Sequence, residues 1–129
     1  MQDGWQKKHL RSIEQAYSRA KWFKKYFGEL EGIILNPNNT LLHQLNEQLL
    51  MFGLRELQMD PIVVRAQDCN FEGAKSDLVL DMCLKLKASD YVFGGEGKNY
   101  ADIGAFESAG VTPWFLNFEG GEYPQMFGA

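Results

Sequence analysis

The sequence predicts an α/β protein with a Rossmann-like layered domain, in which long N-terminal helices precede a small, mainly parallel sheet. Two observations predict this class. Apolar residues recur at helical spacing through most of the first 60 positions. From Ile62 onward, strand-like and helix-like segments alternate in the order strand, helix, strand, helix, strand. Such alternation is typical of parallel strands that are joined by right-handed crossovers.

A first helix is predicted from about Trp5 to Phe27. Apolar residues recur there three and four positions apart, which forms one helix face: Leu10, Ile13, Tyr17, Ala20, Phe23 and Phe27. Gly28 is expected to end the helix. The segment also carries seven basic residues, which we interpret as a solvated face: Lys7, Lys8, Arg11, Arg19, Lys21, Lys24 and Lys25.

A second helix is predicted to follow a turn. The turn spans residues 36–39, where Pro37 fixes φ and asparagine tolerates turn geometry. Asn39 or Thr40 is expected to cap the helix, and Gly53 is expected to end it. Its apolar stripe consists of Leu42, Leu45, Leu49 and Phe52.

The second half is predicted to hold three strands. The β-branched run Ile62–Ala66 is expected to be a buried strand. A loop over 67–75 leads to a helix that opens at Lys75 or Ser76, with Ser76 as its cap. The remaining elements are a strand over 91–93, a glycine loop over 94–100, a helix over 101–109 ended by Gly110, and a strand over 114–118.

The length and composition indicate a single domain over 1–129, with a helical part over 1–59 and an α/β part over 60–129. The net charge is −4, with 13 basic and 17 acidic residues, so we expect no nucleic-acid partner. Cys69 and Cys83 form no CxxC pair and have no histidine at metal-ligand spacing, which indicates reduced thiols and no metal or cofactor. No apolar run could span a bilayer, and we expect a soluble, cytoplasmic protein.

The glycine loop is the first candidate site, because ligands of open α/β sheets lie outside the carboxyl ends of the strands. Its backbone N–H groups and the Lys98 ammonium could hold a phosphate or carboxylate. The alternative is a strand-to-helix turn whose glycines need positive φ. Neither the P-loop pattern nor GxGxxG is present. The candidate ligand-binding residues are Gly94, Gly95, Gly97, Lys98, Asn99 and Tyr100.

Four further residues are candidates outside this loop. Asp68 and His9 are the candidate general bases, with a solvated or capping carboxylate and a surface histidine as the alternatives. Arg65 follows the predicted buried strand and would need a ligand or a carboxylate such as Asp68 as its partner. Tyr123 lies beside Pro124 in a predicted loop, where it could contact a ligand or pack as a lid.

Several short motifs occur in an order and spacing that resemble the WbqC-like protein family. They are Trp5 to Leu10 with Ile13 and Ala16-Tyr17, Leu45-Asn46 with Leu49-Leu50 and Phe52-Gly53, Ala66 to Asp68, Leu84 to Tyr91 with Gly95, Gly97 and Tyr100, Phe106 with Gly110-Val111, and Tyr123-Pro124-Gln125. Two departures stand out. The family's first strand, which ends in His-Gln-Pro, is not found, so the chain resembles the central and C-terminal part of the family fold with the N-terminal segment absent. Lys87 stands where the family has a helix-ending glycine.

The resemblance implies a transferase, with glycine or aminoacyl transfer as one activity, in the biosynthesis of O-antigen or other surface polysaccharides. Its partners would be an anionic small-molecule donor or a sugar-linked acceptor. One alternative is a non-catalytic or truncated accessory protein that pairs with another chain or with a second copy of itself through an open sheet edge. A nucleotidyltransferase-like enzyme ranks lower, because the HxGH-type motif is missing.

Overall fold

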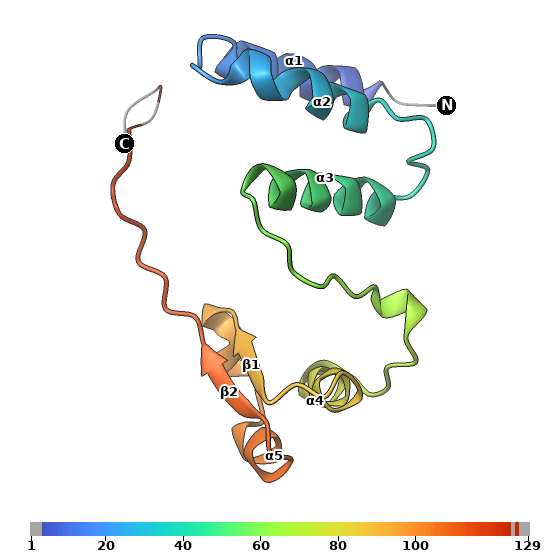
Figure 1. Ribbon diagram of the computed structural model, residues 1–129, viewed down its shortest axis with the longest axis vertical. Helices are drawn as coiled ribbons and strands as arrows, with labels where there is room; N and C mark the ends of the chain where they lie inside the picture. Colours follow the sequence, from blue (N-terminus) through green and yellow to red (C-terminus); the bar gives the residue numbers. More distant parts are fainter. Residues whose placement is uncertain (1–3, 125, 127–129) are drawn as a thin grey trace. The chain divides into compact units, whose positions relative to one another are not determined.

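A computed structural model describes residues 4–124 and 126 of the chain (Figure 1). The chain divides into two compact units. The first unit comprises Met1–Ile62 with Tyr123–Ala129, and the second unit comprises Val63–Glu122. The described residues form five α-helices, two 3-10 helices and two strands.

The first unit contains α1 (Trp5–Tyr17), α2 (Phe23–Ile34) and α3 (Leu42–Glu56). The prediction of one helix from Trp5 to Phe27 is wrong, because the chain turns at residues 18–22. A single straight helix of that length, about 35 Å, would leave most of its apolar stripe without a packing partner. Folding back lets both halves of the stripe pack on one core.

The core of the first unit joins all three helices. Leu10, Ile34 and Leu45 are buried, and each comes from a different helix. The partly buried residues that pack around them are Ile13, Phe27, Leu30, Ile33 and Leu49. The periodicity therefore identified part of the core, including Leu10 and Leu45, but it included the exposed Tyr17 and Leu42 and did not reveal the break between α1 and α2.

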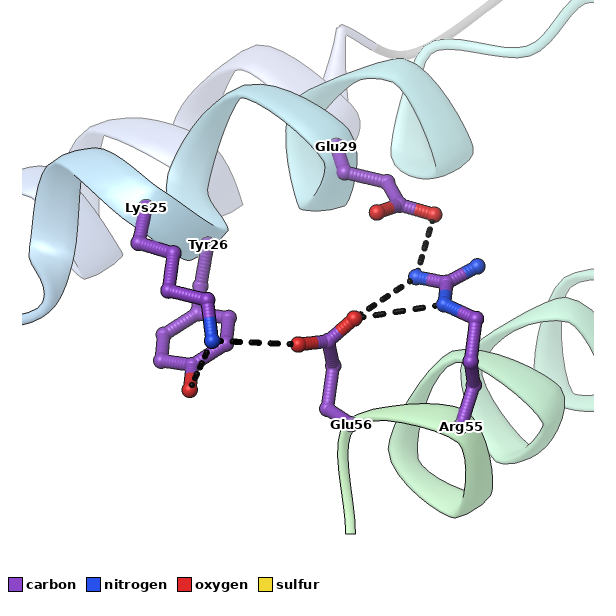
Figure 2. A network of polar contacts seen from close by, with 5 residues as sticks. All are labelled: Lys25, Tyr26, Glu29, Arg55 and Glu56. Carbon is purple, nitrogen blue, oxygen red and sulfur yellow. Dashed lines mark hydrogen bonds and ion pairs between the residues drawn. The ribbon is translucent and has the colours of Figure 1, made fainter. Parts of the chain in front are cut away.

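A surface network of charges also links α2 to α3 (Figure 2). The Arg55 guanidinium donates to a Glu29 carboxylate oxygen (2.7 Å) and to Glu56 (3.1 Å). Lys25 lies 3.6 Å from the other Glu56 oxygen and donates to the Tyr26 hydroxyl (3.1 Å), and this hydrogen bond is the main cause of the raised pKa of Lys25. Lys25, Glu29 and Arg55 are about half exposed, so each ion pair of the network contributes little to stability.

The predicted turn over 36–39 is confirmed, but the predicted helix signals around it are only partly correct. The Asn38 amide donates to the Asn36 side chain (3.0 Å), which is a typical asparagine turn. The cap of α3 is Leu41, where the Gln44 side chain accepts from the backbone N–H (3.0 Å), so neither Asn39 nor Thr40 caps the helix. Gly28 and Gly53 lie inside α2 and α3 and end neither helix.

The second unit is the α/β part. It contains the 3-10 helix η1 (Ala66–Asp68), α4 (Lys75–Lys85), β1 (Asp90–Phe93), the 3-10 helix η2 (Gly95–Asn99), α5 (Ile103–Ser108) and β2 (Thr112–Phe115). The strands pair in parallel, with Asp90 opposite Thr112 and Phe93 opposite Phe115. The α/β class and a small parallel sheet are therefore confirmed, and β2 begins and ends earlier than the predicted 114–118.

The predicted strand Ile62–Ala66 is wrong. Residues 61–65 have no regular structure, and Ala66 begins η1. The Ile62 side chain is 94% exposed, and Val63 and Val64 are exposed as well. A β-branched run favours an extended chain, but it becomes a strand only where another strand offers its N–H and C=O groups.

The core of the second unit covers one face of the sheet. Phe93 and Phe106 are fully buried, and Cys83 of α4 and Val111 pack with them. On the opposite face, Val92 and Trp114 are 61% and 57% exposed. Rossmann-like layering, which needs helices on both faces, is therefore not confirmed in the part of the chain that the structure describes.

Three helices end in the same C-terminal motif. At the end of α4 the Ala88 amide donates to the Cys83 carbonyl (2.8 Å), and the Lys87 amide donates to the carbonyl three residues earlier (3.1 Å). Lys87 has a φ of +57°, a left-handed conformation that favours glycine. The matching left-handed residues are Gln58 after α3 and Gly110 after α5, which ends that helix as predicted.

Ser76 has a different role from the predicted helix cap. The cap of α4 is Ala74, and Ser76 is buried within the first turn. The Ser76 hydroxyl accepts a hydrogen bond from the Asp102 amide (2.9 Å). Asp102 in turn caps α5 by accepting from the Ala105 amide (3.0 Å). The serine therefore ties α4 to the start of α5.

Candidate ligand site at the strand ends

The glycine loop forms η2, which contacts both strands of the sheet. At the carboxyl ends of the two strands, the Leu116 amide donates to the Phe93 carbonyl (2.8 Å). The loop is closed by hydrogen bonds of its own, from the Gly97 amide to the Gly94 carbonyl (2.8 Å) and from the Ala101 amide to the Gly97 carbonyl (2.9 Å). The loop therefore lies at the carboxyl end of the sheet, as predicted, in a tight helical turn (Figure 1).

Gly97 is required for packing. It is buried, and a Cβ at this position would lie 2.4 Å from the Phe93 Cβ. The alternative, that these glycines adopt a positive φ, is wrong, because Gly94, Gly95 and Gly97 all lie outside the left-handed region. The true reason is a close approach to Phe93, which no local pattern of the loop could indicate.

Gly94 and Gly95 differ from Gly97. Both are exposed. A Cβ at Gly94 would meet no atom within 4 Å, and one at Gly95 would make an ordinary contact with the Leu116 carbonyl (3.6 Å). Packing therefore does not demand glycine at either position.

The side chains of the loop carry both signs of charge. The Lys98 ammonium lies 5.8 Å from the centre of the Phe115 ring, at the end of β2. The Asn99 side-chain amide donates to the Glu96 carboxylate (2.6 Å), so the side chain of this candidate ligand residue already has a partner within the loop. An anion bound here would meet Lys98 and the backbone, and it would have to avoid Glu96.

Tyr100 is the last residue of the loop, directly after η2, and its ring is partly packed. Its ring packs edge-on against Phe93, with centroids 6.0 Å apart, and 52% of the residue remains exposed. Its neighbour Tyr91 is less accessible, and burial, followed by the Tyr100 and Cys83 charges, raises the pKa of Tyr91. Burial also raises the pKa of the Cys83 thiol, which therefore stays neutral and serves the core.

Asp68 is the last residue of η1, and Arg65 directly precedes η1. Arg65 Nη1 is 3.8 Å from the Asp68 carboxylate, and both side chains are more than half exposed. Arg65 is thus at the surface and does not follow a buried strand, which corrects its predicted setting.

His9 and Tyr123 belong to the first unit, whereas the glycine loop belongs to the second. His9 is exposed on α1, and its ring centroid lies 6.4 Å from that of Trp5. Tyr123 is also exposed. Gln125, the last residue of the predicted Tyr-Pro-Gln motif, lies outside the described residues.

Two polar groups of the second unit were not predicted. Asp90, at the amino end of β1, accepts from the Ser89 hydroxyl (2.6 Å) and the Trp114 indole (2.9 Å), and these bonds lower the pKa of its carboxyl. Asp81 of α4 accepts from the Glu72 amide (2.8 Å). Both carboxylates therefore accept hydrogen bonds within the fold. The described residues contain no group of three or more His, Cys, Asp or Glu that could hold a metal ion.

Comparison with known proteins identifies the family. The sequence model of the WbqC-like protein family matches residues 1–129, the whole chain. The chain belongs to the WbqC-like protein family. Among curated proteins, this family member is similar to the uncharacterized protein Rv1507c of Mycobacterium tuberculosis, with 26% identity over 125 residues. No solved structure matches.

The extent of these matches bears on the predicted boundaries. The WbqC-like match begins at residue 1, so it does not support the interpretation that the family's N-terminal segment is absent. The similarity to Rv1507c covers 96% of this chain and 54% of that protein, so the chain spans about half the length of the curated relative it matches. None of the described helices is both long and apolar enough to cross a membrane.

Proposed function

We propose that this WbqC-like chain forms a single domain over 1–129 that acts as a transferase in the modification of surface polysaccharides. Its ligand is an anionic donor, such as a nucleotide-linked or aminoacyl group, or a sugar-linked acceptor. A cytoplasmic location is part of the proposal and suits the free thiols of Cys69 and Cys83. The observation that carries the proposal is the exposed backbone of Gly94 and Gly95 at the carboxyl end of a parallel strand pair.

The loop supplies the groups that anion binding needs. Glycine lets a phosphate or carboxylate approach the backbone closely, because no Cβ covers the N–H groups. Lys98 adds an exposed ammonium in the same turn. Tyr100 presents a partly exposed ring beside it, which suits stacking on a base or sugar. Asp68 and His9 remain predicted bases, and the proposal assigns the loop the binding role alone.

The experiment is a calorimetric titration of the chain with nucleotide sugars, aminoacyl donors and sugar phosphates. Lys98→Ala is expected to weaken binding of the active ligand by about 10-fold, the value of one charge-assisted contact. Gly95→Val is also expected to weaken binding, because its side chain would cover the backbone that the ligand approaches. Lys87→Ala removes the same charge from an exposed position on the same unit and is the matched control. Unchanged affinity of Lys98→Ala and Gly95→Val for every ligand that binds the parent chain would refute the binding site.

A second candidate function has its own observation. Val92 and Trp114 expose an apolar sheet face, and β1 has β2 as its only strand partner among the described residues. An accessory protein that pairs with a second copy or another chain would cover such a face. Light scattering after size exclusion tests pairing with a second copy, which requires a mass above that of the 14.7 kDa monomer.

A further inference from the structure

The turn between α1 and α2 carries an unusual combination of side chains. Residues 15–28 contain four cations (Arg19, Lys21, Lys24 and Lys25), five aromatic residues (Tyr17, Trp22, Phe23, Tyr26 and Phe27) and no carboxylate. The chain as a whole has a net charge of −4. This segment is therefore a local basic and aromatic surface on an acidic protein.

The aromatic residues line an apolar groove of about 220 Å³. Its walls come from α1, α2 and the turn between them, and they include Ile13, Tyr17, Trp22, Tyr26 and Phe27. Tyr17 is 54% exposed and Trp22 is 57% exposed. Large apolar side chains at a helix turn, open to solvent and arranged around one groove, are typical of a surface that meets a partner.

Two of the four cations lie over aromatic rings that line the groove. The Lys21 ammonium lies 4.7 Å from the centre of the Trp22 ring, and the Lys25 ammonium lies 4.6 Å from that of Tyr26. Lys25 is also paired with Glu56 of α3. Lys21 and Lys24 are both exposed in this segment, where they can face an external negative charge.

We infer that this surface docks the protein onto an anionic phospholipid bilayer. Tyrosine and tryptophan favour the boundary between headgroups and acyl chains, where an apolar ring and a polar edge are both accommodated. Lysines beside them attract the negative surface of the membrane. The groove accepts an acyl or glycerol segment, and the charge complementarity selects acidic lipids. The inference is independent of the proposed transferase activity, because all of its residues lie in the first unit.

The test is flotation of the full chain with phosphatidylcholine vesicles, with and without phosphatidylglycerol. Binding is expected only with phosphatidylglycerol, and it should weaken as salt rises. The double variant Lys21→Gln, Lys24→Gln is expected to lower the partition coefficient by about 30-fold, since each basic residue near the surface accounts for about 5-fold. Lys75→Gln, Lys87→Gln removes two exposed lysines from the second unit and is expected to bind within about 2-fold of the parent chain.

A matched pair of tryptophans tests the apolar part. Trp22 and Trp114 are both 57% exposed. Trp22→Ala is expected to lower vesicle binding at least about 5-fold, and Trp114→Ala is expected to leave it unchanged. Equal loss in the two tryptophan variants, or equal loss in the two lysine pairs, would overturn the inference. So would binding to neutral vesicles as strong as to acidic ones.

Two other occupants of the groove are also outcomes of the experiment. If a second copy covered it, the chain would be a dimer by light scattering and Trp22→Ala would convert it to a monomer. If the surface held nucleic acid, a single-stranded oligonucleotide would bind and release the chain from acidic vesicles at equal phosphate concentration. Either result contradicts membrane docking.

Discussion

Substitution of Gly97 by alanine tests the packing of the glycine loop in the absence of any ligand. The new Cβ would lie 2.4 Å from the Cβ and 2.9 Å from the Cγ of Phe93, which is closer than carbon atoms can approach. Phe93 cannot move away easily, since it is 1% exposed and packs against Phe106 and Phe115, each with centroids 5.3 Å from its own. Overpacking of this kind costs about 1–3 kcal/mol, and the tightness of the site places Gly97→Ala near 2–3 kcal/mol.

The assay is equilibrium unfolding in urea, followed by Trp114 fluorescence in a background in which Trp5 and Trp22 are replaced by phenylalanine. The signal then reports the second unit alone. Gly94→Ala is the matched control, because its Cβ would meet no atom within 4 Å and its φ of −64° suits alanine. The control should be neutral or more stable by about 0.5 kcal/mol. An unchanged urea midpoint for Gly97→Ala would refute the close approach to Phe93.

Three further predictions concern the second unit, each measured by the same urea unfolding. Lys87→Gly should stabilise by about 1 kcal/mol, because the lysine holds a left-handed φ; destabilisation would contradict the helix-ending motif. Asp81→Asn should destabilise the chain above pH about 4 and match the parent chain as the pH falls below that value. The hydrogen bond from the Glu72 amide lowers the pKa of Asp81, and the stabilisation from this bond is lost when the carboxylate is protonated. A difference between the two chains that persists in acid would contradict this prediction. Ser76→Ala should destabilise by about 1–2 kcal/mol, since the Asp102 amide loses its acceptor, and a neutral effect would disprove the link.

Local patterns predicted the elements whose partners are close in sequence. The strand at Tyr91–Phe93 and the short helix before Gly110 are present, and Leu45 and Leu49 of the predicted stripe of α3 lie in the core. Each of these depends on periodicity or on a nearby glycine, which are visible in one sequence. Lys87, which stands where the resemblance places a helix-ending glycine, adopts the left-handed φ that favours glycine, and this conformation was not predicted.

Elements that depend on distant partners were not predictable. The run Ile62–Ala66 has strand propensity, yet no described strand pairs with it. The apolar spacing between Trp5 and Phe27 continues through the turn between α1 and α2, because both helices contribute residues to one core. Ser76 has the residue type of a cap, but its hydroxyl bonds to the amide of a residue 26 positions away. In each case tertiary contacts outweigh local preference.

The position of the glycine loop in the fold was predicted, but the reasons for its glycines and the setting of Arg65 were not. The glycine loop lies at the carboxyl end of a parallel strand, which the strand-helix alternation indicated. The separate reasons for its glycines were invisible, since the need for Gly97 arises from the packing of Phe93. Arg65 was predicted to follow a buried strand that does not form, so its predicted setting was wrong.

The central claim is that the loop over 94–100 is the ligand site of this WbqC-like chain. Its most direct test is an amide chemical-shift map of the ¹⁵N-labelled chain during titration with a nucleotide sugar or an aminoacyl donor. The account predicts that the largest shifts fall on the amides of Gly94, Gly95 and Lys98, with smaller changes at Tyr100. A ligand that binds and shifts amides elsewhere in the chain, while these four stay unmoved, would contradict it.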